Sequence, residues 1–138
     1  MSNYIEFDIE IDETKAPLTV ATAATGEGRY VVQTRCPADY GHVKLAVEPF
    51  AEVRHVAVEW AVGEEEIPAI YFDAVVEGIR AAASENAGGP VVNVLVRVIG
   101  GSTHFVDSRG RSYRVAAKYA FADALGRAVL VAAGSVSA

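Results

Sequence analysis

The sequence predicts a single α+β domain, because alternating and helical patterns of apolar residues occupy separate segments of the chain. Residues 4–12 alternate between apolar and acidic side chains, which is typical of a half-buried strand. Residues 68–84 and 110–127 instead carry their apolar side chains on one helical stripe. A nearly continuous apolar run, residues 91–99, lies between these two segments. A chain of 138 residues can bury one core, so we expect one domain over residues 1–138.

The N-terminal half predicts a series of strands. In residues 4–12, Ile5 and Phe7 fall on one side and acidic residues on the other, as in an edge strand whose charges discourage strand addition. Carboxylates two residues apart on a flat strand are too distant to chelate one ion, so we expect no metal site there. Residues 14–27 predict a loop or a short extra strand. Further strands are predicted at residues 30–34, 43–47 and 53–60.

The first predicted helix begins at Pro68, a residue favoured in the first turn, after three glutamates that complement the helix dipole. Gly88-Gly89-Pro90 follows the helix and breaks the pattern. The apolar run 91–99 predicts a central strand, since both of its faces are apolar.

The segment after residue 99 predicts a turn at Gly100-Gly101 and a short returning strand over residues 103–106. The second helix is expected to begin near Gly110–Ser112 and to end at about Arg127. The tail after Arg127 predicts a short final strand.

Charge is distributed unevenly along the chain. The formal net charge is −6, which argues against non-specific binding of nucleic acid over the whole surface. Residues 1–13 hold five acids and no base, whereas the segment from Arg97 to Lys118 holds five bases and one acid, Asp107. The molecule is therefore expected to be polarised, with one end that tolerates phosphate.

Several classes of protein are excluded by missing motifs. The phosphate-binding loop of a GTPase is missing, and no nucleophile elbow or zinc-protease motif occurs. Cys36 and the three histidines do not have a metal-ligand spacing, and one cysteine cannot form an intramolecular disulfide. We expect no catalytic residues, cofactor, nucleotide or metal. The chain has no membrane-spanning run and no secretion signal, so we expect a cytoplasmic protein.

Candidate binding residues lie on the second helix and in two loops. Arg111, Arg114 and Lys118 share one helix face, and Arg109 precedes the helix, so the group can hold backbone phosphates or form an ordinary solvated basic face. His104 can contact RNA or satisfy its own turn. Tyr40 and His42 have the same two interpretations. Asp107 and Ser108 are more typical of a helix cap than of a catalytic pair, and His55 is more typical of a structural residue.

Residues 26–128 resemble domain IV of elongation factor G, the ribosomal translocase. In that family, Tyr-Gly-His-Val leads into Val-Glu-Pro, and a helix with Ala-Val-x-x-Gly-Ile precedes Pro-Val-Val-Asp. A loop with Gly-Ser-x-His-x-Val-Asp-Ser follows. The matching segments here are Tyr40-Gly41-His42-Val43, Val47-Glu48-Pro49, Ala74-Val75-Val76-Glu77-Gly78-Ile79, Pro90-Val91-Val92-Asn93 and Gly101-Ser102-Thr103-His104-Phe105-Val106-Asp107-Ser108.

The resemblance implies the fold of the second domain of ribosomal protein S5. That fold has about four strands, two helices on one face and a left-handed βαβ crossover, to which residues 4–12 would add an edge strand. It also implies that two tip loops contact the mRNA–tRNA duplex in the decoding site of the small subunit. The expected RNA-binding residues are Arg35, Tyr40, Gly41, His42, Gly101, Ser102, His104, Arg109, Arg111, Arg114 and Lys118.

The chain departs from the family in its first tip loop. Where the family has Gly-Gly-Arg-Gly-Gln before the tyrosine, Pro37 and Asp39 replace flexible, RNA-tolerant positions here, which favours a protein partner over RNA. The resemblance further implies a stand-alone domain without the GTPase that normally accompanies it. We therefore expect a non-catalytic ribosome-binding or RNA-binding module that modulates translation or acts with a larger factor. The alternative is a protein–protein interaction domain that kept the fold and lost RNA binding, and a small enzyme ranks below both.

Overall fold

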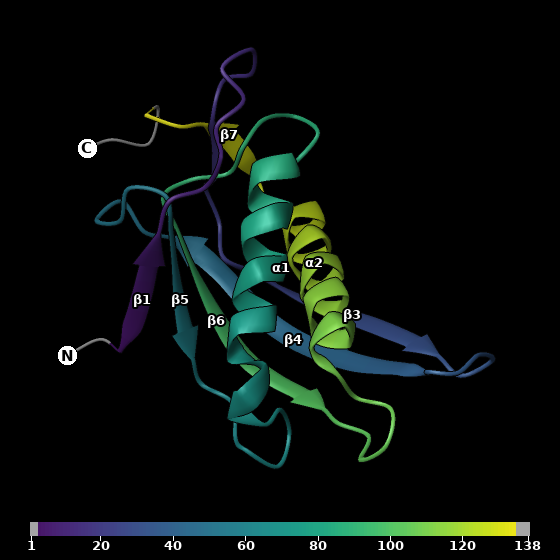
Figure 1. Cartoon of the computed structure of the whole chain (residues 1–138). Helices are drawn as coiled ribbons and strands as arrows, with labels where there is room; N and C mark the ends of the chain where they lie inside the picture. The colour runs from purple at the N-terminus through teal and green to yellow at the C-terminus, as the bar shows by residue number, and fades with distance from the viewer. Residues whose placement is uncertain (1–2, 135–138) are drawn as a thin grey trace.

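A computed structural model describes residues 3–134. Two helices lie against one face of a mixed sheet, and a small second sheet lies at one end (Figure 1). The helices are α1 (Phe72–Glu85), preceded by the 3-10 turn η1 (Ala69–Tyr71), and α2 (Gly110–Arg127). The strands are β1 (Tyr4–Phe7), β2 (Leu18–Val20), β3 (Ala24–Val32), β4 (Asp39–Pro49), β5 (Val56–Trp60), β6 (Val94–Ser102) and β7 (Leu130–Ala132).

The main sheet has the strand order β1-β5-β6-β4-β3, and β2 pairs with β7 in the second sheet. Within the described part of the main sheet, β5 and β6 are the parallel pair, and α1 connects them. In Figure 1 both strands run downwards, β6 lies to the right of β5, and α1 lies in front of the sheet. The β5–α1–β6 crossover is therefore left-handed, as the family resemblance implied and against the usual rule for such units.

The core lies between the sheet and the two helices. Valines dominate the inner faces of β4 and β6, and both helices turn their small or bulky apolar residues towards them. The largest fully buried side chains include Tyr113 and Phe121 of α2 and Ile79 of α1. Because β6 is the middle strand of the sheet and the helices cover its inner face, Val94, Val96 and Val98 are fully buried, whereas Arg97 and Ile99 of the outer face are partly exposed.

Helix α2 lies unusually close to β3 because that strand presents glycines to it. A Cβ atom added at Gly26 would lie 2.2 Å from the backbone oxygen of Ala120, and one added at Gly28 would lie 2.2 Å from that of Ala116. A Cβ atom at Gly41 of β4 would lie 2.3 Å from the oxygen of Ser112. These contacts hold the start of α2 against the start of β4.

Most predicted elements are confirmed. Both helices, the central position of β6, the edge position of β1 and the strand in the tail are all present. Strand β3 begins at Ala24, earlier than the sequence predicted, since its inward glycines hide the apolar alternation. Strand β1 ends at Phe7, where its partner strand begins at Val56, so residues 8–12 have no strand to pair with. Ile9 is nevertheless buried, and its N–H donates to His55 Nδ1 over 2.9 Å.

The predicted turn at Gly100-Gly101 and the returning strand over residues 103–106 are wrong. Both glycines continue β6 and pair with Lys44 and Val43 of β4. The chain then enters a tight loop in which the N–H of Ser108 donates to the oxygen of His104, and the oxygen of Asp107 accepts from the N–H of Tyr40 in β4.

We expect the Gly28→Ala substitution to lower the free energy of unfolding by about 2 kcal/mol or more, because the new methyl group meets the backbone of α2. Urea unfolding measures the change. Gly126→Ala on α2 itself is the control, since nothing lies within 4 Å of its Cβ position. That variant should gain up to about 1 kcal/mol from helix propensity. Equal stabilities of the two variants would contradict the close packing.

Candidate nucleic-acid interface at the tip of the sheet

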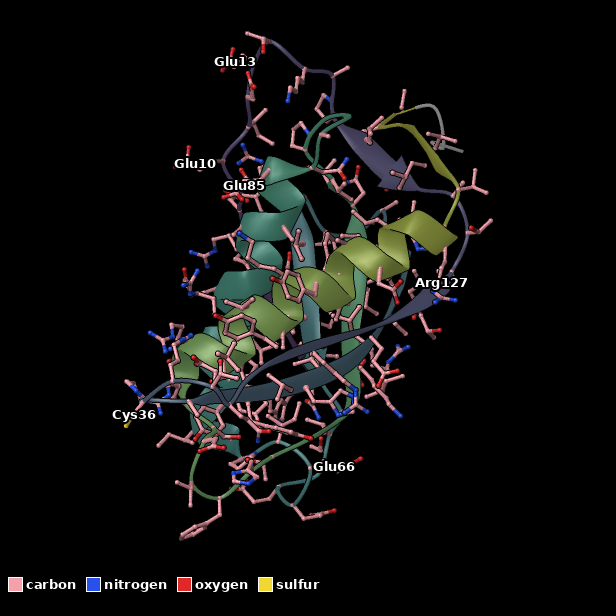
Figure 2. All side chains as sticks on the ribbon, turned by 90° about the vertical axis from the view of Figure 1, so that its right-hand side faces the viewer. Glu10, Glu13, Cys36, Glu66, Glu85 and Arg127 are labelled. Carbon is pink, nitrogen blue, oxygen red and sulfur yellow. The ribbon has the colours of Figure 1, made fainter. Side chains whose placement is uncertain are left out.

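Three loops meet at one end of the molecule, which we call the tip. They are residues 33–38 between β3 and β4, residues 61–68 after β5, and residues 103–109 between β6 and α2. They converge because β4 begins where β6 ends, with His42 opposite Ser102. In Figure 2, Cys36 and Glu66 mark the tip, while the acidic Glu10 and Glu13 lie at the opposite end.

The fully buried carboxylate of Asp39 is the centre of the tip. Arg111 Nη2 donates to Asp39 Oδ2 over 2.7 Å, and Arg35 Nη2 donates to the same oxygen over 2.9 Å. Ser112 Oγ donates to Asp39 Oδ1 over 2.8 Å, and Arg109 Nε lies 3.8 Å from that oxygen. The hydrogen bond from Arg111 is the main cause that lowers the pKa of Asp39 to about 2, although burial opposes it. Asp39 therefore stays ionised throughout the physiological range.

The three guanidinium groups around Asp39, which we call the arginine cluster, outnumber its single negative charge. The side chains of Arg35, Arg109 and Arg111 are 43%, 36% and 45% exposed, so each remains in contact with solvent. Arg35 also donates to the oxygen of Pro37, and Arg109 to that of Ala38. A guanidinium has five N–H groups, so each keeps donors beyond these bonds. The cluster is thus a fixed, partly exposed region of positive charge.

His42 is bonded on both of its ring nitrogens. Nδ1 bonds to Ser102 Oγ over 2.7 Å, and Nε2 bonds to the carboxylate of Glu27. Ser102 Oγ also bonds to the hydroxyl of Tyr40 over 2.8 Å. The hydrogen bond from His42 lowers the pKa of Glu27. Only 6% of the His42 side chain is exposed, so it ties β3, β4 and β6 together and does not offer a free ring to a ligand.

The loop over residues 103–109 closes on Ser108. Its hydroxyl accepts from the N–H of His104 over 2.9 Å and donates to the oxygen of Tyr40 over 2.8 Å. The His104 ring lies 5.8 Å from the ring of Tyr40, and its Nδ1 accepts from the N–H of Asp107. The prediction that Asp107 or Ser108 caps α2 is wrong, because the N-cap is Arg109 without a side-chain cap. Ser108 instead connects the loop over residues 103–109 to Tyr40 of β4.

The other predicted RNA-binding residues differ in whether they have a partner within the protein. Arg114 is exposed on α2, and its side chain makes no hydrogen bond or ion pair with any residue in the range 3–134. Lys118, one turn further from the tip, pairs with Glu85 over 3.4 Å. Gly41 and Gly101 lie against backbone and apolar atoms, where a Cβ would collide, so they allow close packing of the tip.

Sequence reasoning missed two members of this site. It treated Asp39 as a substitution that disfavours RNA, and it did not connect Glu27 with His42. The cross-strand register Arg29–His42 places Glu27 beside His42 on the outer face of the sheet. The pairing of β3 with β4 would have identified Glu27 as the partner of His42, but the sequence alone does not fix the register of that pairing.

The comparisons with known proteins agree with this geometry. The family model of elongation factor G, domain IV, matches residues 16–129. The chain belongs to this family. It is 38% identical over 115 residues to elongation factor G of Thermotoga maritima and 36% identical over 115 residues to that of Petrotoga mobilis. Each match covers 80% of this chain and 16% of the relative.

Among solved structures, a crystal structure of a Thermus thermophilus protein superimposes with a TM-score of 0.78 at 32% sequence identity. The match covers 91% of this chain and 19% of that one. This chain therefore spans less than a fifth of the elongation factors and of the solved structure that it matches, and it corresponds to their domain IV part.

Two other kinds of feature are missing from residues 3–134. No group of three or more histidine, cysteine or acidic side chains there could hold a metal ion. Neither helix is long and apolar enough to cross a membrane.

We expect Asp39→Ala to lower the free energy of unfolding by about 2 kcal/mol, because Arg111, Arg35 and Ser112 all lose a charged acceptor. Asp8→Ala is the control, since Asp8 is exposed and lies no closer than 3.5 Å to its two partners, Arg54 and His55. The control should change stability by about 0.5 kcal/mol at most. Urea unfolding of both variants measures the difference, and an equal effect would remove Asp39 from the centre of the tip.

The Asp39 carboxyl also predicts a pH dependence of stability. Its pKa falls from 3.8 to about 2 on folding, so the folded protein favours the ionised form. The stability it contributes is full above roughly pH 5 and is lost as the pH falls through about 4 towards 2. The difference in free energy of unfolding between the unmodified chain and Asp39→Asn should shrink over that range. A difference that stays constant from about pH 6 to about pH 2 would contradict the assignment.

Proposed function

We propose that the tip binds RNA at the decoding site of the small ribosomal subunit, as a non-catalytic module. The observation that carries the proposal is the arginine cluster. Arg35 comes from the first loop, whereas Arg109 and Arg111 come from the start of α2, and all three surround Asp39 at the end of the molecule that corresponds to the family's decoding-site tip. A ribosomal partner would place the protein in the cytoplasm.

Charge supports an oriented mode of binding. The arginine cluster and Arg114 lie at or next to the part of the tip formed by residues 33–38 and 103–109, while Glu10 and Glu13 lie at the far end (Figure 2). The third tip loop, residues 61–68, carries three exposed acids, Glu64, Glu65 and Glu66. RNA phosphates attract the arginines and repel the acids, so the net charge of −6 does not prevent binding. It restricts binding to the arginine side of the tip, away from the acidic loop over residues 61–68.

The geometry divides the expected RNA-binding residues into two groups. Arg35, Arg109, Arg111 and Arg114 are exposed enough to contact phosphate, and His104 and Tyr40 lie beside them. His42, Ser102 and the two glycines instead hold the loops in position. We therefore propose that phosphate contacts come from the arginines and that His42 acts as a positioning residue.

A protein–protein interaction domain is the second candidate. Ile70 is 83% exposed on η1, beside the tip, and the buried Asp39 offsets part of the arginine charge. Both features favour a protein partner over RNA. Since this chain's match covers only 16% of the whole elongation factor, any GTP-driven step would need a larger factor.

The proposal predicts that the chain co-sediments with small ribosomal subunits and that binding weakens as salt is raised. Arg114→Gln should weaken binding and lower the slope of the logarithm of affinity against the logarithm of salt by about one. Arg114 is the residue of choice because it has no partner within residues 3–134, so its loss leaves the Asp39 network intact.

Arg54→Gln is the matched control. It removes the same charge from an exposed side chain that pairs with Asp8, away from the tip. Absence of binding at low salt would overturn the proposal. An equal loss with Arg54→Gln would show that binding does not depend on the tip. Salt-independent capture of a ribosomal protein would favour the second candidate.

A further inference from the structure

The most exposed apolar side chains of the tip lie at the crown of the loop over residues 103–109. Phe105 is fully exposed, and Val106 beside it is 72% exposed. Phe105 and Val106 are neighbours, so together they form a contiguous exposed apolar surface bordered by polar residues, a feature of interaction sites. In the family pattern the corresponding position is variable, so the resemblance assigns no role to this side chain.

The loop that carries Phe105 is fixed by its own hydrogen bonds. The N–H of Ser108 donates to the oxygen of His104 over 3.0 Å, and the N–H of His104 donates to Ser108 Oγ over 2.9 Å. Tyr71 adds a bond from its hydroxyl to the oxygen of Ser108 over 3.1 Å. The crown of the loop is thus held in place before any ligand arrives, which reduces the entropic cost of binding.

The surroundings of Phe105 indicate the chemistry of its partner. The neighbouring ring of His104 is 46% exposed and lies against Tyr40, so aromatic groups continue along the loop. The arginine cluster lies at the base of the same loop, through Arg109. Asp107, the acid of this loop, is 19% exposed; its carboxylate accepts from Gln33 and lies 3.5 Å from His104 Nδ1, so it is already engaged within the tip. An aromatic ring and a guanidinium group on the same loop complement a nucleotide, which has a base and a phosphate.

We propose that Phe105 stacks on an unpaired RNA base while the arginine cluster holds the adjoining phosphates. The inference rests on the proposed function and adds the kind of RNA that the tip selects. Bases within a duplex are already stacked on their neighbours, so only a single-stranded, bulged or terminal nucleotide can offer its face to the ring. The tip is therefore expected to prefer unpaired nucleotides to an uninterrupted duplex.

The test measures binding of the chain to a short single-stranded RNA that contains 2-aminopurine, at low salt, together with a fully paired duplex of the same sequence. Stacking on the ring should quench the fluorescence of the probe. Phe105→Ala should weaken binding to the single strand about fivefold or more and remove the quenching. Phe105→Tyr, which keeps the ring, should stay within about twofold of the unmodified chain, and binding to the duplex should change by less than about twofold in either variant.

Ile70→Ala is the control, because it removes an exposed apolar side chain next to the tip without changing the aromatic loop. Unchanged affinity of Phe105→Ala for the single strand, with quenching retained, would overturn the inference and leave the proposed function standing. If Phe105→Ala loses binding to small subunits but keeps its affinity for the oligonucleotide, Phe105 contacts a ribosomal protein, and the inference is overturned. If the unmodified chain binds neither RNA nor subunits, the proposed function fails as well.

Discussion

The buried carboxylate of Asp39 holds the tip together. It lies at the first residue of β4 and receives hydrogen bonds from Arg35 in the preceding loop and from Arg111 and Ser112 at the start of α2. Burial of an ion without partners is costly, so this carboxylate requires the surrounding donors and thereby fixes their positions. The same contacts gather like charges that would otherwise separate. A residue that first suggested loss of RNA binding is thus the one that assembles the positive surface.

The tip also depends on how closely α2 approaches the sheet. Glycines in β3 and β4 remove the side chains that would keep the helix at a normal distance. Ser112 can reach Asp39 only because the backbone at Gly41 lies directly under the first turn of the helix. The hydrogen-bonded chain of Tyr40, Ser102, His42 and Glu27 performs the same task on the opposite face of the sheet. The loops of the tip are therefore attached to strands that are held in place on both faces of the sheet.

This arrangement separates two kinds of residue within the family motifs. Tyr-Gly-His-Val and Gly-Ser-x-His contribute mainly to the architecture of the tip, through one buried imidazole, one shared hydroxyl and two glycines. The groups that remain available to a ligand come from less regular positions, namely the arginines around Asp39, Arg114 and the aromatic ring of Phe105. Differences between members of the family at these positions can alter the ligand without changing the fold.

The sequence by itself determined the helices, the central valine strand, the edge strand and the family, because each depends on local periodicity or on motifs in a fixed order. It also identified the basic stripe on α2. It could not determine that Gly100 and Gly101 continue β6, or that β3 begins at Ala24, since glycines carry no apolar pattern and strand pairing is non-local. Only the tertiary structure decided that Asp39 is buried among arginines, that His42 is enclosed by Glu27 and Ser102, and that Phe105 is left in solvent. The physical reason is that burial and ionic pairing depend on neighbours as far as 73 residues away in the chain, which the β4–β6 register and the packing of α2 bring together.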